Sequence, residues 1–311
     1  MIKETLTREE RFMTAVKLDI PDRVPVSSMF DEFALRQKGI THQQRFDPAC
    51  QPLILNTFHQ IFDDLGGYDI QWHAGTGFPF SSWKSCCDIR INSVPQGSES
   101  TLQAERESLL ADDYDKIINL GWNGFCQELY PRLTGMSINQ LDDNQKKALA
   151  KYMEDVQWWK ARGVPVHMGA TVMNPEVILS LGRTLPKFTI EMHRQPDKIL
   201  AVINAMVDDL VQNAIADARA MEIPWAHILL TRGSGTFYNL RIFEKFIFPS
   251  LKKMVNAFST QGLYVNLHCD TNWIINLPYF KEFPAGKCVI ELDGTTDIIK
   301  AKEILRGHIC I

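Results

Sequence analysis

Seven short apolar segments alternate with helix-like stretches along the chain, and this alternation restricts the fold more than any other feature. The segments are rich in residues that suit a pleated, packed surface. They are residues 23–30, 68–72, 165–171, 226–231, 264–269, 288–293 and 308–311. Strands separated by helices at this spacing form parallel βαβ units. We therefore expect a (β/α)8 TIM barrel, with the last βα unit missing from this chain.

A single barrel domain over residues 1–311 is expected, with two additions to the repeat. Residues 1–22 form an N-terminal helical extension, in which Thr7 and Glu10 have the spacing of a capping box. Residues at about 75–110 form an excursion with an antiparallel, strand-like pattern. A Rossmann fold is the alternative, but no Gly-x-Gly-x-x-Gly follows any expected strand, and Gly233-Ser234-Gly235 is only a fragment of such a loop.

The composition is typical of a globular protein and does not indicate a nucleic-acid partner. The 311 residues are 45% hydrophobic and 23% charged, with a formal net charge of −4. No Lys/Arg cluster suited to nucleic acid is present. No apolar run approaches the ~18 residues of a membrane span, and the first residues lack the apolar core of a signal peptide. The seven scattered cysteines suggest no disulfide framework. A cytoplasmic protein with free thiols is therefore expected.

The strand at residues 264–269 runs into a cluster of potential metal ligands. His268 and Cys269 end this strand and Asp270 follows it. In a barrel, the carboxyl ends of the strands carry the chemistry. Imidazole, thiolate and carboxylate are all ligands of zinc. These three residues are therefore the candidate metal site, and the alternative is a core histidine beside a buried thiol.

Acidic and aromatic residues end the first two expected strands. Asp31 and Glu32 could act as an acid/base pair, or they could be helix-capping or solvated acids. Trp72 could stack on an aromatic substrate, and His73 could hydrogen-bond it or act in catalysis. The alternative for both is a packed loop. Phe78, in the following loop, is a candidate wall of the substrate site or part of a turn.

Later strands add further candidates for substrate binding. His167 and Met168 lie within one strand, where His167 could instead be a core histidine with its hydrogen bonds satisfied. Arg232 follows a strand and would suit a substrate carboxylate, or it could form a structural salt bridge. Asp293 ends its strand and could hold a histidine ligand in place.

Three stretches together resemble the uroporphyrinogen decarboxylase superfamily. Residues 7–26 combine a charged opening helix with Pro-Asp-Arg-Val-Pro-Val, and residues 243–270 combine a Phe-Glu-x-Phe-x-x-Pro helix with a strand that ends in Leu-His. Residues 291–311 contain Leu-Asp-Gly-Thr-Thr-Asp followed by Lys-Ala-Lys-Glu-Ile-Leu. The resemblance implies a (β/α)8 barrel that acts either as a decarboxylase or as a corrinoid-dependent methyltransferase.

The methyltransferase branch resembles this chain better than the decarboxylases do. The haem-pathway decarboxylases carry Arg-Gln-Ala-Gly-Arg-Tyr near the first strand, where this chain has Met29-Phe30-Asp31-Glu32-Phe33. The methyltransferases bind zinc through His-x-Cys and a distant cysteine. Aligning His268 places Asp270 at the cysteine position, so that either Asp270 or Cys269 is the ligand or no metal binds, and the distant cysteine is expected beyond Ile311. His308-Ile309-Cys310 matches His-x-Cys literally, but on the next-but-one strand.

The resemblance implies a methyltransferase component that takes a methyl group from a small methoxylated or methylated compound. Zinc would polarise the leaving atom, and a corrinoid on a separate partner protein would accept the methyl group. The demethylating direction is favoured, and a homodimer is compatible with the chain. The alternatives are a metal-independent decarboxylase or lyase on the same barrel, and a non-catalytic subunit that docks a corrinoid protein.

Overall fold

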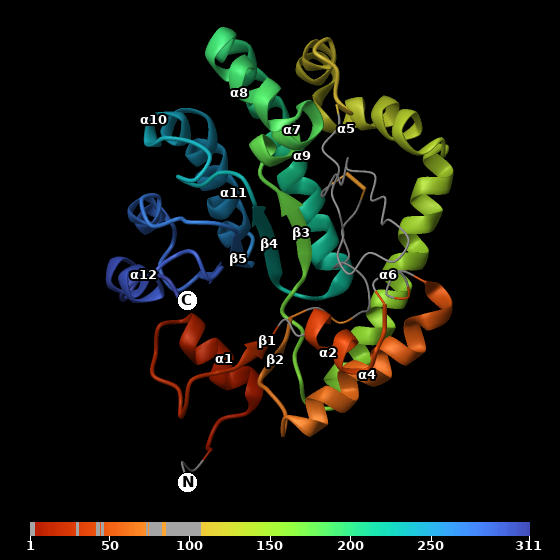
Figure 1. Cartoon of the computed structure of the whole chain (residues 1–311), viewed down its shortest axis with the longest axis vertical. Helices are drawn as coiled ribbons and strands as arrows, with labels where there is room; N and C mark the ends of the chain where they lie inside the picture. The colour runs from red at the N-terminus through yellow and green to blue at the C-terminus, as the bar shows by residue number, and fades with distance from the viewer. Residues whose placement is uncertain are drawn as a thin grey trace.

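The fold is a mixed α/β arrangement in which parallel strands are surrounded by helices (Figure 1). The computed structural model describes residues 4–28, 31–41, 44, 47–72, 74, 83–84 and 107–311. The strands are β1 (Ser27–Ser28), β2 (Ile70–Gln71), β3 (Ala170–Met173), β4 (Trp225–Leu230), β5 (Tyr264–Cys269) and β6 (Cys288–Leu292). All the ladders between them are parallel, in the two-stranded order β1-β2 and the four-stranded order β3-β4-β5-β6.

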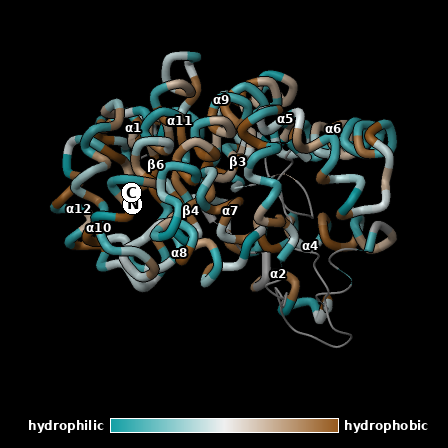
Figure 2. Tube along the Cα trace, turned by 90° about the horizontal axis from the view of Figure 1, so that it is seen from above, coloured by the Kyte–Doolittle hydropathy of each residue, from teal (hydrophilic) through white to brown (hydrophobic). Residues whose placement is uncertain are grey.

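The helices fill the intervals between the strands, as the alternating pattern predicts. They are α1 (Arg8–Val16), α2 (Asp31–Gln37), η1 (Pro48–Cys50), α4 (Gln51–Asp64), α5 (Asp113–Thr134), α6 (Ile138–Lys160), α7 (Pro175–Arg183), α8 (Leu185–Arg194), α9 (Pro196–Met221), α10 (Leu240–Ile242), η2 (Phe243–Ile247), α11 (Phe248–Thr260), η3 (Leu277–Glu282) and α12 (Ile298–Leu305). Seen from above, α5, α9 and α11 alternate hydrophilic and hydrophobic residues along their traces (Figure 2). This is the pattern of helices that bury one face and meet water on the other.

The third expected strand joins the two sheets through a bend at Gly169. Before the bend, His167 N and Met168 N donate to the carbonyl oxygens of Gln71 and Trp72, at 3.2 and 2.9 Å. After it, β3 pairs with β4. A Cβ on Gly169 would lie 2.3 Å from the carbonyl oxygen of Trp225, so only glycine allows this approach. The chain thus places its first six expected strands side by side in sequence order.

The first expected strand is shorter than residues 23–30. Pro25 has no N–H to donate, and Val26 instead accepts from the amides of Asp69 and Ile70 just before β1. At the other end of the array, Cys310 forms a parallel bridge with Val289. Among the residues that the structure describes, no ladder joins Cys310 to β1, so the array is open there and a closed barrel is not observed.

Two other expectations concern the segments around this array. The capping box of the first helix is confirmed, because Glu10 N donates to Thr7 Oγ1 at 3.2 Å and Thr7 N donates to Glu10 Oε2 at 2.9 Å. The excursion at about 75–110 lies mostly outside the described residues.

The helix α9 is long and apolar enough, by length and composition alone, to cross a membrane. Half of its apolar window is buried and it packs on α5, α11 and β3, as a core helix does.

Candidate functional site

The register of the sheet brings polar side chains together on one face, from the middle of β4 and β5 toward the carboxyl ends of β5 and β6. His227 on β4 lies opposite Asn266 on β5, and His268 on β5 lies opposite Glu291 on β6. Residues two apart in a strand point to the same face. His227, Asn266, His268 and Glu291 therefore share one face, and these four side chains form what we call the imidazole–carboxylate cluster.

Glu291 is the centre of the hydrogen bonds in this cluster. Its Oε1 accepts from Trp72 Nε1 and from Asn266 Nδ2, each at 2.6 Å. Its Oε2 lies 2.9 Å from His268 Nδ1. Burial raises the pKa of this carboxyl group, but the hydrogen bonds from His167 and His268 outweigh burial and hold the pKa well below its usual range. Glu291 is therefore a carboxylate that is fixed in orientation.

His268 lies between two carboxylates. Besides the contact with Glu291, its Nε2 is 3.3 Å from Asp270 Oδ1. Burial lowers the pKa of the imidazole, but the hydrogen bonds with Asp270 and Glu291 raise it more, to about 10. With this pKa, His268 is an imidazolium near neutral pH as long as no metal ion is bound to it.

His227 is buried among polar groups without using either ring nitrogen. Its side chain is completely buried, and neither Nδ1 nor Nε2 has a hydrogen-bond partner within the described part of the chain. Its ring packs edge-to-face on Trp72 with a centroid separation of 5.5 Å, and it lies 5.5 Å from the ring of His268. Burial lowers the pKa of His227 to about 3, so the ring is neutral and both nitrogens are poorly satisfied.

Three side chains of the cluster could hold a metal ion. One donor atom each from His227, His268 and Glu291 lie within 4.8 Å of one another. Two imidazole nitrogens and one carboxylate oxygen are a ligand set that catalytic zinc accepts, with a further position left open. The nitrogens of His227, which have no partner among the described residues, are a second and independent indication of a bound ligand. The residues present therefore fit a divalent metal ion.

Two of the three predicted metal ligands lie next to this cluster, and the third does not. His268 belongs to it and Asp270 touches His268, as described above. Cys269 follows His268 in β5 and so points to the opposite face, where its side chain is in the hydrophobic core. Burial raises the pKa of the thiol well above its ordinary value, which disfavours the thiolate that zinc would need.

The predicted substrate residues are divided between the cluster and its surroundings. Trp72 bonds Glu291, and His167 Nε2 lies 3.1 Å from Asn266 Nδ2 and 3.6 Å from Glu291 Oε1. Met168 is instead completely buried in the core. Arg232 Nη1 donates to the carbonyl oxygen of Ser180, at 3.2 Å.

Of the remaining predicted residues, the structure places only Asp293. The backbone of Asp31 and Glu32 begins α2, but their side chains lie outside the described residues, as do His73 and Phe78. Their proposed roles stay predictions. Asp293, expected to hold a histidine, instead accepts from Thr271 N at 2.6 Å and Thr295 N at 2.9 Å. Glu291, two residues earlier, contacts the histidine.

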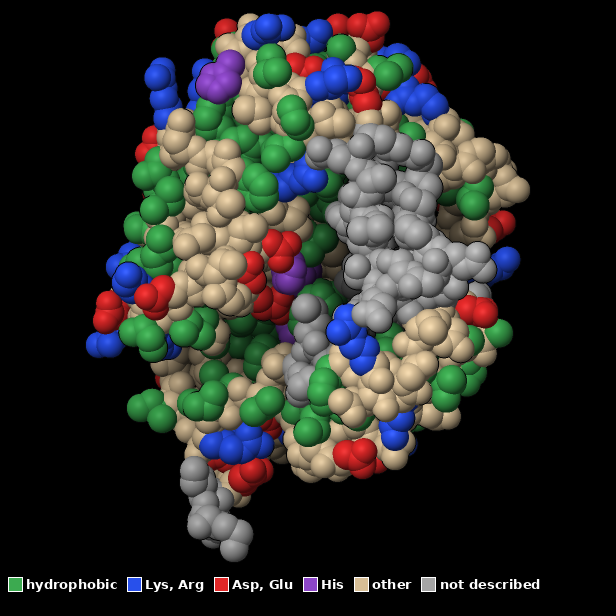
Figure 3. Space-filling model, in the orientation of Figure 1, with side chains coloured by type: hydrophobic (Ala, Val, Ile, Leu, Met, Phe, Trp, Pro, Cys, Tyr) green, Lys and Arg blue, Asp and Glu red, His purple; other side chains and the backbone are tan. Residues whose placement is uncertain are grey.

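A cavity of about 510 Å³ adjoins the cluster. Figure 3 shows acidic and histidine side chains gathered in a hollow of the molecular surface. The cavity combines residues of the site with residues from the first and last strand-like segments. Its lining includes Pro25, Ser27, Trp72, His167, His268, Asp270, Glu291, Cys310 and Ile311. The cluster is therefore accessible to a small molecule from the open edge of the array.

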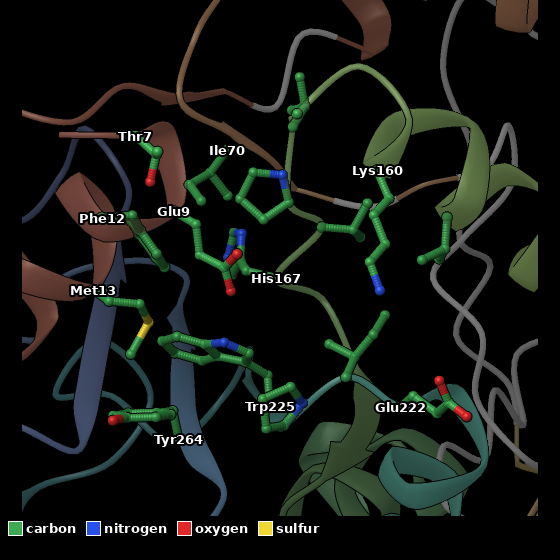
Figure 4. A pocket seen from close by; sticks show the side chains of 17 residues that line it. Thr7, Glu9, Phe12, Met13, Ile70, Lys160, His167, Glu222, Trp225 and Tyr264 are labelled. Atoms are coloured by element: carbon green, nitrogen blue, oxygen red, sulfur yellow. The ribbon is translucent and has the colours of Figure 1, made fainter.

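A second cavity, of about 540 Å³, lies at the opposite ends of the strands. Phe12, Met13, Trp225 and Tyr264 line it (Figure 4), and His167 borders both cavities. Its mainly apolar lining carries no convergent metal-binding group among the described residues. Of the two cavities, the first is the one that His268 and Glu291 of the cluster line.

Another buried acid lies after β3. Glu176 is completely buried in the first turn of α7 and accepts a hydrogen bond from Asn174 Nδ2, while Ser250 Oγ donates to Asn174 Oδ1 at 3.0 Å. The other carboxyl oxygen of Glu176 has no hydrogen-bond partner among the described residues. Burial raises its pKa to about 8, so the acid is largely protonated near neutral pH.

Sequence reasoning did not single out Glu291, His227, Asn266 or Glu176. The first three could have been found by parity, because each is polar at an alternate position of an otherwise apolar strand. Glu176 carries a weaker signal, since an acid in the first turn of a helix is common.

Comparison with known proteins supports the fold. No protein-family profile matches the chain, and no curated protein sequence matches it. Among solved structures, the chain is similar to a methyltransferase from Methanosarcina mazei, with a TM-score of 0.61. The two are 13% identical, and the match covers 97% of this chain and 81% of that one. At this identity the similarity is one of fold.

Proposed function

We propose that this chain is a methyltransferase that moves a methyl group from a small methoxylated or methylated compound to a corrinoid on a separate protein. The observation that carries the proposal is the cluster of His227, His268 and Glu291, in which His268 and Glu291 lie toward the carboxyl ends of β5 and β6 and line a cavity of about 510 Å³. Active sites of barrel enzymes are built at these ends. The fold similarity to a methyltransferase agrees with this function.

We also propose that the strand array belongs to a (β/α)8 barrel. The support is the sequence order of its parallel strands and the alignment of nearly the whole chain with the methyltransferase structure. In a closed barrel, an eighth strand lies between the last strand and the first. The first cavity, lined by both Ser27 and Cys310, adjoins that position.

Each residue of the site has a separate task in the proposed reaction. A zinc ion bound at His268 would supply a Lewis acid that stabilises the negative charge on the atom that loses its methyl group. Trp72 and Asn266 hold Glu291 in one orientation, with its Oε2 facing the ring of His268. Such fixed partners keep the reacting geometry without reorganisation. The ring of Trp72 also gives the cavity an apolar surface for a substrate.

A second candidate function is a metal-independent lyase. The specific observation in its favour is the raised pKa of His268, about 10, which makes the ring an imidazolium at the edge of the cavity. Such a group could donate a proton to a carbanion after decarboxylation. In that case Asp270 and Glu291 would serve to keep the proton on the ring. A non-catalytic docking subunit, the third alternative, would need neither chemistry.

A methyl-transfer assay distinguishes these functions. The purified protein is incubated with zinc, chemically reduced cobalamin as the acceptor, and a panel of methoxylated aromatic compounds, methylamines and methylthiols. Formation of methylcobalamin is followed by absorbance. We expect transfer from at least one donor, and a loss of about 100-fold or more in His268→Ala. The control is Lys252→Ala, which removes only an exposed ion pair with Glu282.

The outcomes separate the three alternatives. No transfer from any donor, with carbon dioxide released from a carboxylated compound, would contradict the methyltransferase and favour the lyase. No chemistry at all, with retained binding of a corrinoid protein, would indicate the docking subunit.

The cytoplasm is the proposed compartment, since the five cysteines among the described residues are free of disulfides.

A further inference from the structure

We propose that the metal ion is held by His227, His268 and Glu291, a ligand set without any thiolate. This inference deepens the proposed function and rests on it for the presence of a metal. It departs from the His-x-Cys pattern of the resembling family in two ways: it excludes Cys269, and it adds a histidine from the neighbouring strand. The observation behind it is the buried ring of His227, whose two nitrogens have no hydrogen-bond partner among the described residues.

His227 has a position that a purely structural role does not explain. The ring is completely buried, and both nitrogens lack partners among the described residues. Buried polar atoms without partners are rare and costly in folded proteins. An apolar residue would fill the same space between Trp72 and His268 without that cost. A ligand bound to one ring nitrogen accounts for the imidazole.

The hydrogen bonds of Glu291 indicate which of its oxygen atoms is available. Oε1 already accepts from Trp72 and Asn266 at 2.6 Å. Oε2 faces His268 Nδ1 at 2.9 Å. Two ligand atoms on a tetrahedral zinc ion lie about 3.3 Å apart. A small opening of this contact is therefore enough to place an ion on Oε2 and Nδ1.

With the ion on Nδ1, Asp270 supports His268 from the other side of its ring. Its Oδ1 lies 3.3 Å from His268 Nε2, the ring nitrogen opposite to the one that faces Glu291. A metal-binding histidine commonly donates its second N–H to a carboxylate, which fixes the ring and makes it a stronger ligand. The opposite assignment places the ion between Nε2 and Asp270. Asp270 is not in the group of converging donors, which argues against that assignment.

The donor set also predicts the metal chemistry. Two imidazoles and one carboxylate bind zinc in several hydrolytic enzymes and bind ferrous iron in oxygenases. Without a thiolate, the site has no soft ligand and no preference for monovalent copper. Cobalt(II) is then a suitable spectroscopic probe, since it takes the same ligands as zinc and reports a bound thiolate by charge-transfer absorption.

The test is cobalt(II) binding to the full chain, freed of metal with a chelator and measured by competition against that chelator. Wild type is compared with His227→Ala, Cys269→Ser and Asp270→Asn. We expect cobalt d–d absorption without a thiolate charge-transfer band. His227→Ala should lose affinity by about 100-fold or more, Asp270→Asn by about 10-fold, and Cys269→Ser not at all. His227→Leu, which fills the space, is the second variant if His227→Ala does not fold.

Three results would overturn the inference. They are a thiolate band in the wild type that disappears in Cys269→Ser, unchanged cobalt affinity in a folded His227 variant, and no cobalt binding by the wild type. Each is read from binding alone, without the methyl-transfer assay. A protein that binds cobalt as expected but transfers no methyl group would leave the ligand set intact and refute the proposed function.

Discussion

Two buried clusters of ionisable groups lie at opposite ends of the strand array, and they differ in how completely they are paired. The first, which we call the lower cluster, lies at the amino end of β2 and joins Arg11 and Arg23 to Asp22 and Asp69. Arg11 is 1% exposed and Asp69 is completely buried. The upper, imidazole–carboxylate cluster contains buried groups as well, but both nitrogens of His227 lack partners among the described residues.

The lower cluster is a closed network. Arg11 donates to Asp22, to Asp69 and to the carbonyl oxygen of Leu6, and Asp69 also accepts from Arg23 and Val26 N. It ties α1 to the start of β2. The hydrogen bond with Arg11 is the main cause that lowers the pKa of Asp22. Every group that could bind a ligand is already used, so the network is structural.

The comparison shows which buried charges indicate function. A saturated network stabilises the fold, whereas a fixed set of donors with spare capacity is suited to bind something else. The upper cluster has that spare capacity at His227, next to His268 and Glu291, which lie toward the strand ends where barrel enzymes place their chemistry.

Asp69→Asn should destabilise the protein by about 3 kcal/mol, because it leaves two arginines short of a buried partner. The measurement is the free energy of unfolding from urea denaturation at neutral pH. Metal binding by the folded fraction should not change, because the substitution lies at the other end of the strands. A loss of less than about 1 kcal/mol would mean that the lower cluster does not stabilise the fold appreciably.

Glu176→Gln should change how stability depends on pH. The folded pKa of Glu176, about 8, is above its ordinary value of 4.5, so the folded protein holds a proton that the unfolded chain releases. The stabilising contribution is complete below pH 4.5 and is lost as the pH rises toward 8. The slope from this group is at most about 1.4 kcal/mol per pH unit. Urea denaturation across this range should show a steeper decline in wild type than in the variant, and parallel curves would contradict the prediction.

His227→Leu should stabilise the metal-free protein by about 1 kcal/mol, because it removes a buried polar group without partners. The same variant should lose metal affinity. Thermal or urea unfolding in the presence of a chelator gives the stability, and chelator competition gives the affinity. A variant that is less stable than metal-free wild type would mean that the imidazole contributes to packing or hydrogen bonding.

Glu4→Gln should have the smallest effect, within about 0.5 kcal/mol. Glu4 contacts both arginines of the lower cluster, at 3.2 and 2.8 Å, but its side chain is 55% exposed. This variant is the matched control for Asp69→Asn, since it removes a charge from the same network at its solvent-exposed edge. Equal losses in the two variants, measured by urea denaturation, would contradict the importance assigned to burial.

Much of the fold could be predicted from the alternation of apolar segments and helical patterns. The βαβ order follows from local sequence. The bounds of the strands do not, because they depend on neighbours. The proline at Pro25 shortens β1, and the close approach of Trp225 to Gly169 divides the third strand between two sheets. Closure of the array into a barrel stays a proposal.

The site could be predicted only in part. His268, Asp270 and Trp72 could be found because each comes at the end of an expected strand. His227 and Glu291 come from two other strands, and their meeting depends on the register between strands, which packing fixes rather than local sequence. Strand parity separates Cys269 from His268, although they are adjacent in the sequence.

The most direct test of the central claim is the metal content of the protein as purified. Wild type and His268→Ala are prepared in parallel and zinc is measured by elemental analysis, with Lys252→Ala as the control. The account predicts about one zinc ion per chain in wild type and in the control, and almost none in His268→Ala. Absence of metal from the wild type, or an equal amount in His268→Ala, would contradict a metal centre at the end of β5.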